Sequence, residues 1–174
     1  GLDVFEKPVN GRNYVCCVDV ARGVNKDYSA FLIFDVTKMP YRVVAKYRSN
    51  EVKPILFPHL ISKACHGYNK CEILCETNDI GQQIGESLNY ELEYPNLLMT
   101  TQRGRAGQIL GAGYSGRGSG FGVRMTKQIK KVGCSNIKTL IEGDKVVIND
   151  FNIIEEMSTY TRKNQSWQAE EGCN

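Results

Sequence analysis

The sequence YVCCVDVARG, residues 14–23, decides how the rest of the chain is interpreted. It opens with a short run of small and β-branched apolar residues, and because polar turn formers bound this run, it predicts a buried strand. Asp19 lies at the carboxyl end of that strand. In α/β sheets such strand ends face the crevice in which ligands bind, so Asp19 is a candidate metal ligand or base. The alternative is that Asp19 caps the turn through its own backbone.

The segments that follow predict a mixed sheet. Residues 28–36 and 41–47 are expected to add two antiparallel strands to the first. Residues 53–67 carry apolar side chains at helical spacing and end at Gly67, a plausible helix stop, and residues 72–76 (EILCE) form a short strand that ends in Glu76. The intervening helix can return this strand parallel to the first. Asp19 and Glu76 are then expected at the same edge of the sheet, on strands about 4.8 Å apart.

The remaining elements are expected to alternate between helices and short strands. A helix is predicted over residues 82–90, with Thr77, Asn78 or Asp79 as its N-cap, followed by a strand at 97–100. A helical region from Lys127 to Gly143, a strand at 145–149, a helix at 152–160 and a last strand at 166–169 complete the chain. No repeat or linker divides the sequence, so residues 1–174 are expected to form one domain.

A basic, glycine-rich stretch follows the strand at 97–100. Residues 102–132 contain no Asp or Glu, although the net charge of the whole chain is only +3. Residues 102–124 predict a mobile loop or hairpin, and its positive charge favours contact with a DNA backbone over the alternative of a solvated helix face. The candidate DNA-binding residues are Arg103, Arg105, Arg117, Arg124, Lys127, Lys130 and Lys131. The glycines lack the strand and helix context of a nucleotide-binding loop, so ATP hydrolysis is not expected.

The overall composition is that of a globular chain. Of 174 residues, 41% are apolar and 24% charged. No run approaches 18 apolar residues, so no membrane span is expected, and no N-terminal stretch has the basic, apolar, small-residue order of a secretory signal. Seven cysteines suit a reducing cytosol better than a disulfide framework. A zinc site is disfavoured because the cysteines show no paired C-x-x-C spacing; the residues considered for it are Cys65, Cys71, Cys75, His59 and His66.

The two carboxylates and the basic stretch fit metal-assisted hydrolysis of a phosphodiester. In a two-metal site the ions lie about 3.5–4 Å apart and acidic side chains bridge them. Mg²⁺ prefers oxygen ligands and retains several waters, so two or three acids suffice. Asp19 is expected to bridge both ions and Glu76 to hold one, with Mg²⁺ or Mn²⁺ as the cofactor.

Five motifs, in their order and spacing, resemble the nuclease domain of the large terminase, the DNA-packaging motor protein of T4-like tailed bacteriophages. They are VCCVDVARG at 15–23, KDYSA at 26–30, CETND at 75–79, KVGC at 131–134 and AEEG at 169–172. The resemblance implies a ribonuclease-H-like α/β fold, in which three antiparallel strands and then parallel strands form a mixed central sheet flanked by helices. This fold is shared with Holliday-junction resolvases and integrases.

The resemblance also implies an activity and a setting. The family cuts concatemeric viral DNA at the start and end of packaging, with low sequence specificity. The implied partners are double-stranded DNA, the terminase ATPase domain, the small terminase and the portal, in the host cell cytoplasm. The ATPase domain, normally N-terminal, is expected to be absent from these 174 residues.

The family's active site contains three acids, and two of them match Asp19 and Glu76. The third belongs to an Asp-Asp pair expected just after Asn174, so this chain is expected to bind metal weakly and to cut slowly or not at all. Asp27 is expected to support the site from the second shell of residues. The other acids considered, Asp79, Asp144 and Asp150, are expected to serve as turn or cap residues.

Two other functions fit the same residues. In one, the chain grips DNA through its basic residues without catalysis, and Asp19 and Glu76 are structural. In the other, it is a junction-resolvase-like or integrase-like nuclease of the same fold, because fold does not fix substrate.

Overall fold

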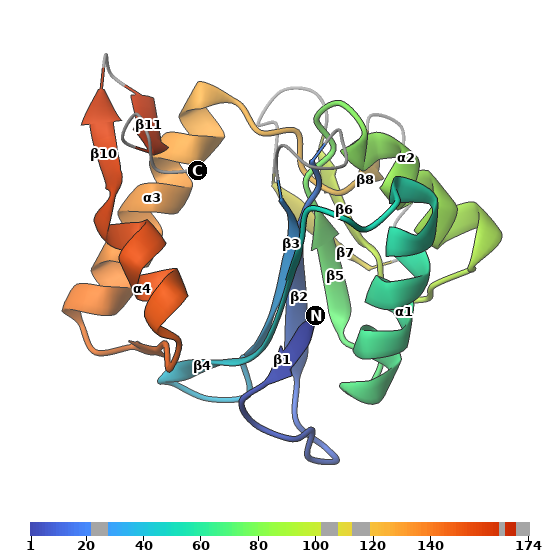
Figure 1. The fold of residues 1–174 in the computed structure, drawn as a ribbon, viewed down its shortest axis with the longest axis horizontal. Coiled ribbons are helices and arrows are strands. Elements are labelled where there is room, and N and C mark those ends of the chain that lie inside the picture. Colours follow the sequence, from blue (N-terminus) through green and yellow to red (C-terminus); the bar gives the residue numbers. More distant parts are fainter. Residues whose placement is uncertain (22–27, 102–107, 113–118, 164–165, 170–174) are drawn as a thin grey trace.

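The computed structural model describes residues 1–21, 28–101, 108–112, 119–163 and 166–169. Within these residues the central sheet has the strand order β1-β4-β3-β2-β5, with the short β9 beside β4 (Figure 1). The predicted antiparallel trio is present as β2 (Tyr14–Asp19), β3 (Ser29–Asp35) and β4 (Tyr41–Ser49). The edge strand β1 (Leu2–Val4), which pairs antiparallel with β4, was not predicted.

The crossover after β4 brings the next strand back parallel to β2, as predicted. It contains the 3₁₀ turn η1 (Pro54–Leu56) and the helix α1 (Phe57–Gly67), and it leads into β5 (Glu72–Cys75). Prolines are tolerated in the first turn of a helix because its N–H groups have no partner there. Gly67 does not adopt the left-handed conformation of a helix stop; Asn69 and Lys70 do, with φ of 58° and 55°.

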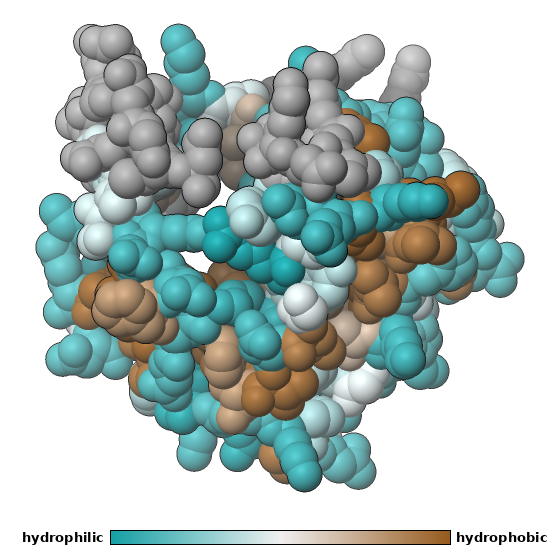
Figure 2. Space-filling view, in the orientation of Figure 1, coloured by the Kyte–Doolittle hydropathy of each residue, from teal (hydrophilic) through white to brown (hydrophobic). Residues whose placement is uncertain are grey.

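The main hydrophobic core lies between the sheet and the helices α1, α2 (Gly81–Glu86) and η2 (Ser87–Glu91). The largest fully buried side chains of this core are Phe31, Ile33, Phe57, Ile61, Ile73 and Leu88. Each contributes about 1.5–3 kcal/mol relative to an exposed position. On the same side of the molecule hydrophobic residues also gather at the surface (Figure 2), and η1 and α1 expose Ile55, Leu56 and Leu60.

A second layer, on the other side of the sheet, is formed by the C-terminal elements (Figure 1). These are α3 (Lys127–Glu142), α4 (Phe151–Ser158), β10 (Tyr160–Lys163) and β11 (Ser166–Ala169), whereas β9 (Val146–Val147), between the two helices in the chain, belongs to the central sheet. The bounds of α3 and β11 are close to the predicted ones, but the helix predicted over residues 152–160 ends at Ser158, and β10 was not predicted. Two ion pairs tie α4 to β4: Lys46 Nζ lies 2.7 Å from Asp150 Oδ2, and Arg48 lies 3.0 Å from Glu156. Burial opposes ionisation of Asp150, but the ammonium of Lys46 holds the pKa of its carboxyl below the usual range.

The glycine-rich stretch contributes strands to a separate small sheet. In this sheet β6 (Leu98–Thr101) lies between β7 (Ile109–Ala112) and β8 (Ser119–Phe121), both antiparallel to it. The described part of the stretch is therefore not a simple hairpin, because β7 and β8 each pair with β6. The predicted mobility of residues 102–124 concerns in part residues 102–107 and 113–118, which lie outside the described residues.

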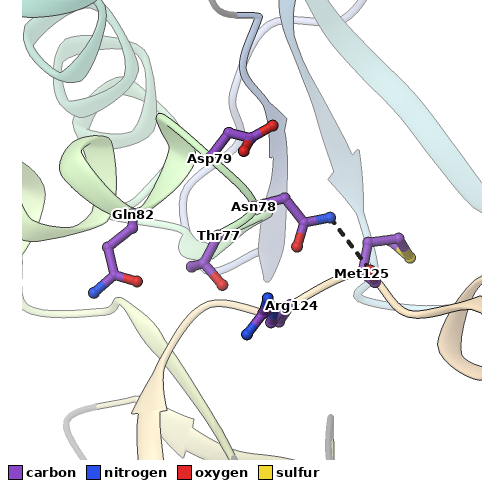
Figure 3. Close-up of a pocket in the computed structure, with 6 residues that line it drawn as sticks. All are labelled: Thr77, Asn78, Asp79, Gln82, Arg124 and Met125. Atoms are coloured by element: carbon purple, nitrogen blue, oxygen red, sulfur yellow. Dashed lines mark hydrogen bonds between the residues drawn. The ribbon is translucent and has the colours of Figure 1, made fainter.

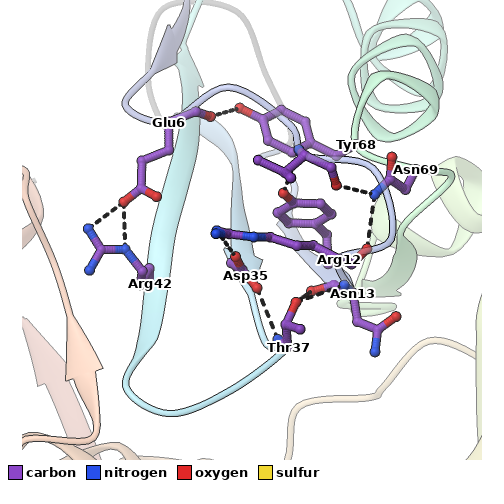
Figure 4. Close-up of polar contacts among 10 residues, drawn as sticks. Glu6, Arg12, Asn13, Asp35, Thr37, Arg42, Tyr68 and Asn69 are labelled. Atoms are coloured by element: carbon purple, nitrogen blue, oxygen red, sulfur yellow. Dashed lines mark hydrogen bonds and ion pairs between the residues drawn. The ribbon is translucent and has the colours of Figure 1, made fainter.

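Polar contacts fix the segment before β2 at the end of the strands opposite Asp19 (Figure 4). Arg12 Nη1 donates to Asp35 Oδ2 at 2.8 Å, and Arg42 Nε donates to Glu6 at 2.6 Å. Asn69 donates to the carbonyl oxygen of Arg12 at 2.9 Å. These bonds join the segment to β3, to β4 and to the residues that follow α1, so they stabilise the fold away from the candidate site. None of the helices that the structure describes is long and apolar enough to cross a membrane.

Candidate functional site

Asp19 and Glu76 lie together at the carboxyl ends of two neighbouring parallel strands. Val18 of β2 is paired with Cys75 of β5, and the Glu76 amide donates to the Val18 carbonyl oxygen at 2.9 Å. Asp19 is exposed, whereas Glu76 is partly buried. Burial and, next, the negative charge of Asp19 raise the pKa of the Glu76 carboxyl. The predicted meeting of the two acids at one edge of the sheet is therefore observed.

The backbone of Glu76 is clamped between β2 and the segment that follows β8. Val123 N donates to the Cys75 carbonyl at 2.8 Å, and Thr77 N donates to the Val123 carbonyl at 2.9 Å. Gly122 approaches this point with φ of 67°, and a Cβ there would overlap the Cys75 carbonyl oxygen. A Cβ on Gly81 would likewise overlap the Glu76 carbonyl oxygen. Glycine at these two positions allows the close approach that holds the carboxylate in place.

Asn78 binds the Glu76 side chain directly. Its Nδ2 donates to Glu76 Oε1 at 2.8 Å and to the Met125 carbonyl oxygen at 3.3 Å, the second of which is drawn in Figure 3. The prediction that Thr77, Asn78 or Asp79 caps the next helix is wrong. Ile80 occupies the N-cap of α2 without a side-chain bond. A polar residue two positions after the acid was visible in the sequence, but the preference of Asn for helix caps concealed this contact.

A polar pocket of about 560 Å³ adjoins Glu76. Figure 3 shows Gln82, Thr77 and Asn78 coming from the β5–α2 side, and Arg124 and Met125 from the segment before α3. The Arg124 side chain, a predicted DNA contact, thus belongs to a wall of this pocket, which Asp79 also lines. Asp19 and Glu76 do not line the pocket; its connection to the acids is Asn78, which lines it and binds Glu76.

The three predicted lysines all lie in the first two turns of α3. Thr126 caps this helix, since its Oγ1 accepts from Ile129 N at 3.2 Å. Lys130 lies close enough to Glu76 for its positive charge to lower the pKa of the Glu76 carboxyl, against the effects of burial and Asp19. Its Nζ also lies 5.4 Å from the centre of the Tyr160 ring. Lys127 and Lys131 are exposed. The other predicted site residues, Asp27, Arg103, Arg105 and Arg117, lie outside the described residues.

The remaining acids considered as ligands have structural roles. Asp150 caps α4, with its Oδ1 accepting from Ile153 N at 2.8 Å, and also pairs with Lys46. Asp144 and Asp79 adopt left-handed turns, each with φ of 52°. Within the described ranges, no group of three or more His, Cys, Asp or Glu side chains is arranged to hold a metal ion. Asp19 and Glu76 are the two predicted site acids that the strand pairing brings together.

The fold is shared with solved terminase nucleases. The large terminase nuclease of the thermophilic phage G20c, with bound magnesium, matches with a TM-score of 0.71 and 18% identity, covering 98% of this chain and 79% of that one. Its cobalt-bound form matches equally, covering 98% and 78%. The nuclease domain of the Thermus phage P74-26 large terminase matches with a TM-score of 0.69 and 19% identity, covering 99% and 78%. At these identities the likeness establishes the fold.

The predicted mixed sheet flanked by helices, of the ribonuclease-H-like type, is thus confirmed. A family model described as the terminase RNaseH-like domain matches residues 16–173, which is nearly the whole chain. This match covers both acids, Asn78 and the basic helix α3. The chain therefore belongs to the family of terminase RNaseH-like domains.

Proposed function

We propose that this chain is a metal-dependent endonuclease domain that cuts concatemeric viral DNA during genome packaging, with low sequence specificity. The observation that carries the proposal is the convergence of Asp19 and Glu76 at adjacent strand ends. Two neighbouring carboxylates repel one another and disfavour the folded state unless a cation binds to both. Solved nucleases of the same fold hold magnesium, cobalt or zinc, which supports a divalent cation as the group that neutralises the two carboxylates.

The donor set fits Mg²⁺ or Mn²⁺. Both side chains offer carboxylate oxygens, the ligands these ions prefer, and the exposure of Asp19 leaves room for coordinated waters. Asp19 and Glu76 would both hold the cation in a complete site. A bound divalent ion would supply a nucleophilic hydroxide at neutral pH and neutralise charge on the scissile phosphate.

The basic residues around the acids would hold the DNA. Arg124 lines the pocket that Asn78 also lines, and Lys130 lies close enough to the Glu76 carboxylate for its charge to act on it. Lys127 and Lys131 extend this positive charge along the exposed start of α3. Contacts of this kind bind phosphates irrespective of sequence, which suits an enzyme that cuts with little base preference. Arg103, Arg105 and Arg117 are proposed to add to this contact, and Asp27 to support the acids.

The wider setting is part of the same proposal. Residues 1–174 would form one nuclease domain that acts on double-stranded DNA beside the terminase ATPase domain, the small terminase and the portal in the host cytoplasm. Family membership supports this setting.

Plasmid nicking tests the proposal. The chain is incubated with supercoiled plasmid and Mg²⁺, Mn²⁺ or EDTA, next to the variants Asp19→Asn and Glu76→Gln and the control Asp144→Asn, whose acid lies in the turn after α3. We expect slow, metal-dependent nicking in the wild type and the control, and at least tenfold less in both site variants, with DNA retention on a gel unchanged. Intact plasmid in every reaction, with DNA still retained, would favour a DNA-gripping module instead.

A further inference from the structure

The amide of Asn78 can adopt only one orientation in its surroundings. Its NH₂ group carries two donors, and both acceptors next to it are accounted for: Glu76 Oε1 at 2.8 Å and the Met125 carbonyl oxygen at 3.3 Å. If the amide were rotated by 180°, its oxygen would face two acceptors and both bonds would be lost. The chemistry of the neighbours therefore determines where the nitrogen lies.

The backbone around Asn78 is also held in place. The Asn78 carbonyl oxygen accepts from Gly81 N at 3.0 Å. The backbone N–H of the preceding residue, Thr77, donates to the Val123 carbonyl oxygen at 2.9 Å. Asn has only two side-chain torsions, so little freedom is lost when its amide is held. The donor that faces Glu76 is preorganised by the fold and does not depend on a ligand.

We propose that Asn78 is a positioning residue for metal binding: its amide fixes the orientation of the Glu76 carboxylate beside Asp19. This inference rests on the proposed function, because it assigns Glu76 to a divalent cation. A carboxylate on a free Glu side chain rotates and samples several rotamers, whereas one that accepts a bond at 2.8 Å keeps its second oxygen in a defined direction. Hydrogen-bond partners of metal ligands commonly change metal affinity by about 10–100-fold.

The same amide also joins Glu76 to the segment that leads into α3, the helix proposed to contact DNA. Met125, whose carbonyl accepts the second bond, directly precedes Thr126, the N-cap of α3. Asn78 thus holds the Glu76 carboxylate and the backbone before the N-cap of α3 at a fixed separation. Gln82 lines the same pocket, but its side chain donates to Glu86, so it does not share this role.

The test is a titration with Mn²⁺ alone, with unbound Mn²⁺ followed by electron paramagnetic resonance. Asn78→Ala removes the donor, and Asn78→Leu removes it while nearly preserving the shape of the side chain. Asn136→Ala, at an exposed position of α3, is the matched control. We expect about 10–100-fold weaker Mn²⁺ binding in both Asn78 variants and unchanged binding in the control.

A double-mutant cycle with Glu76→Gln shows whether Asn78 acts through Glu76. Adding Asn78→Leu to Glu76→Gln is expected to weaken Mn²⁺ binding by less than threefold, because the carboxylate to be oriented is already gone. Wild-type affinity in folded Asn78→Leu protein, or an equal loss in both backgrounds, would overturn the inference and leave the proposed function standing. Wild-type protein that binds no Mn²⁺ would overturn both.

Discussion

Replacing Glu76 by glutamine is expected to stabilise the metal-free protein. The Glu76 carboxylate is partly buried and lies beside Asp19, and both conditions raise its pKa because they disfavour its charged form. Glutamine removes the charge but retains an Oε1 that can accept from Asn78 Nδ2, so the hydrogen bond at 2.8 Å is preserved. The substitution therefore isolates the electrostatic cost of the acid.

The magnitude follows from the strand pairing. Neighbouring strands lie about 4.8 Å apart, and two unit charges at about 5 Å repel by about 0.8 kcal/mol in water and about 3 kcal/mol near a protein surface. Asp19 is exposed and Lys130 partly offsets the charge of Glu76, so the lower figure is appropriate. We expect Glu76→Gln to gain about 1 kcal/mol in the free energy of unfolding, or about 2–4 °C in Tm.

The gain should depend on pH in a defined direction. A carboxyl whose pKa is higher in the folded than in the unfolded state binds more protons when folded, so stability falls as pH rises through this range. Below the ordinary glutamate pKa of about 4.3, both states are protonated and Glu76 has no cost. The stability difference between Glu76→Gln and wild type should therefore be full at pH 7 and nearly absent at pH 3.5.

Urea unfolding in EDTA at the two pH values measures this effect. Glu51→Gln, at an exposed position, is the matched control and should change stability by less than about 0.5 kcal/mol. The double variant with Asp19→Asn should gain less than the sum of the two single gains, because either substitution already removes the repulsion. A loss of stability in Glu76→Gln at pH 7, or strictly additive gains, would refute the reasoning.

Three further predictions concern the support of the site. Asp150→Ala should lose about 1–3 kcal/mol in urea unfolding, because it removes the cap of α4 and leaves Lys46 with only its more distant partner, Asp3, at 3.7 Å. A loss below about 0.5 kcal/mol would contradict this. Gly81→Ala should lose more than about 2 kcal/mol in the same assay, because its Cβ would overlap the Glu76 carbonyl oxygen. Its control, Gly133→Ala, lies at an open helical position and should gain up to about 1 kcal/mol. Equal effects of the two substitutions would contradict the close packing around the Glu76 backbone. Lys131→Ala should lower the slope of log K against log salt for duplex binding by about 1, and an unchanged slope would remove this residue from the interface.

The sequence was sufficient to predict the main sheet and the position of both acids. Strands such as β2 and β5 carry dense runs of apolar residues, and the helix between them permits only a few connections, so the pairing of Val18 with Cys75 could be anticipated. The cap at Asp150 could also be predicted, since Asp150 directly precedes an apolar helical segment. The structure confirms it, because the Asp150 side chain accepts from Ile153 N.

The features that were missed depend on contacts between distant segments. The edge strand β1 pairs with residues more than 40 positions away, and its three residues show no distinctive pattern. Asn78 is one of three predicted helix caps on its residue type, but the approach of Met125, 47 positions later, provides a second acceptor for its amide. The helix α1 ends at Gly67, but the left-handed turn that follows lies at Asn69 and Lys70, beyond the C-cap Tyr68.

Direct measurement of metal binding tests the central claim, that Asp19 and Glu76 together form a divalent metal site. Isothermal titration with Mn²⁺ would compare the wild type, Asp19→Asn, Glu76→Gln and the control Asp144→Asn. The account predicts saturable, weak binding in the wild type and the control, and at least tenfold weaker binding in each site variant, a loss of at least about 1.4 kcal/mol. Equal Mn²⁺ affinity in all four proteins would contradict it.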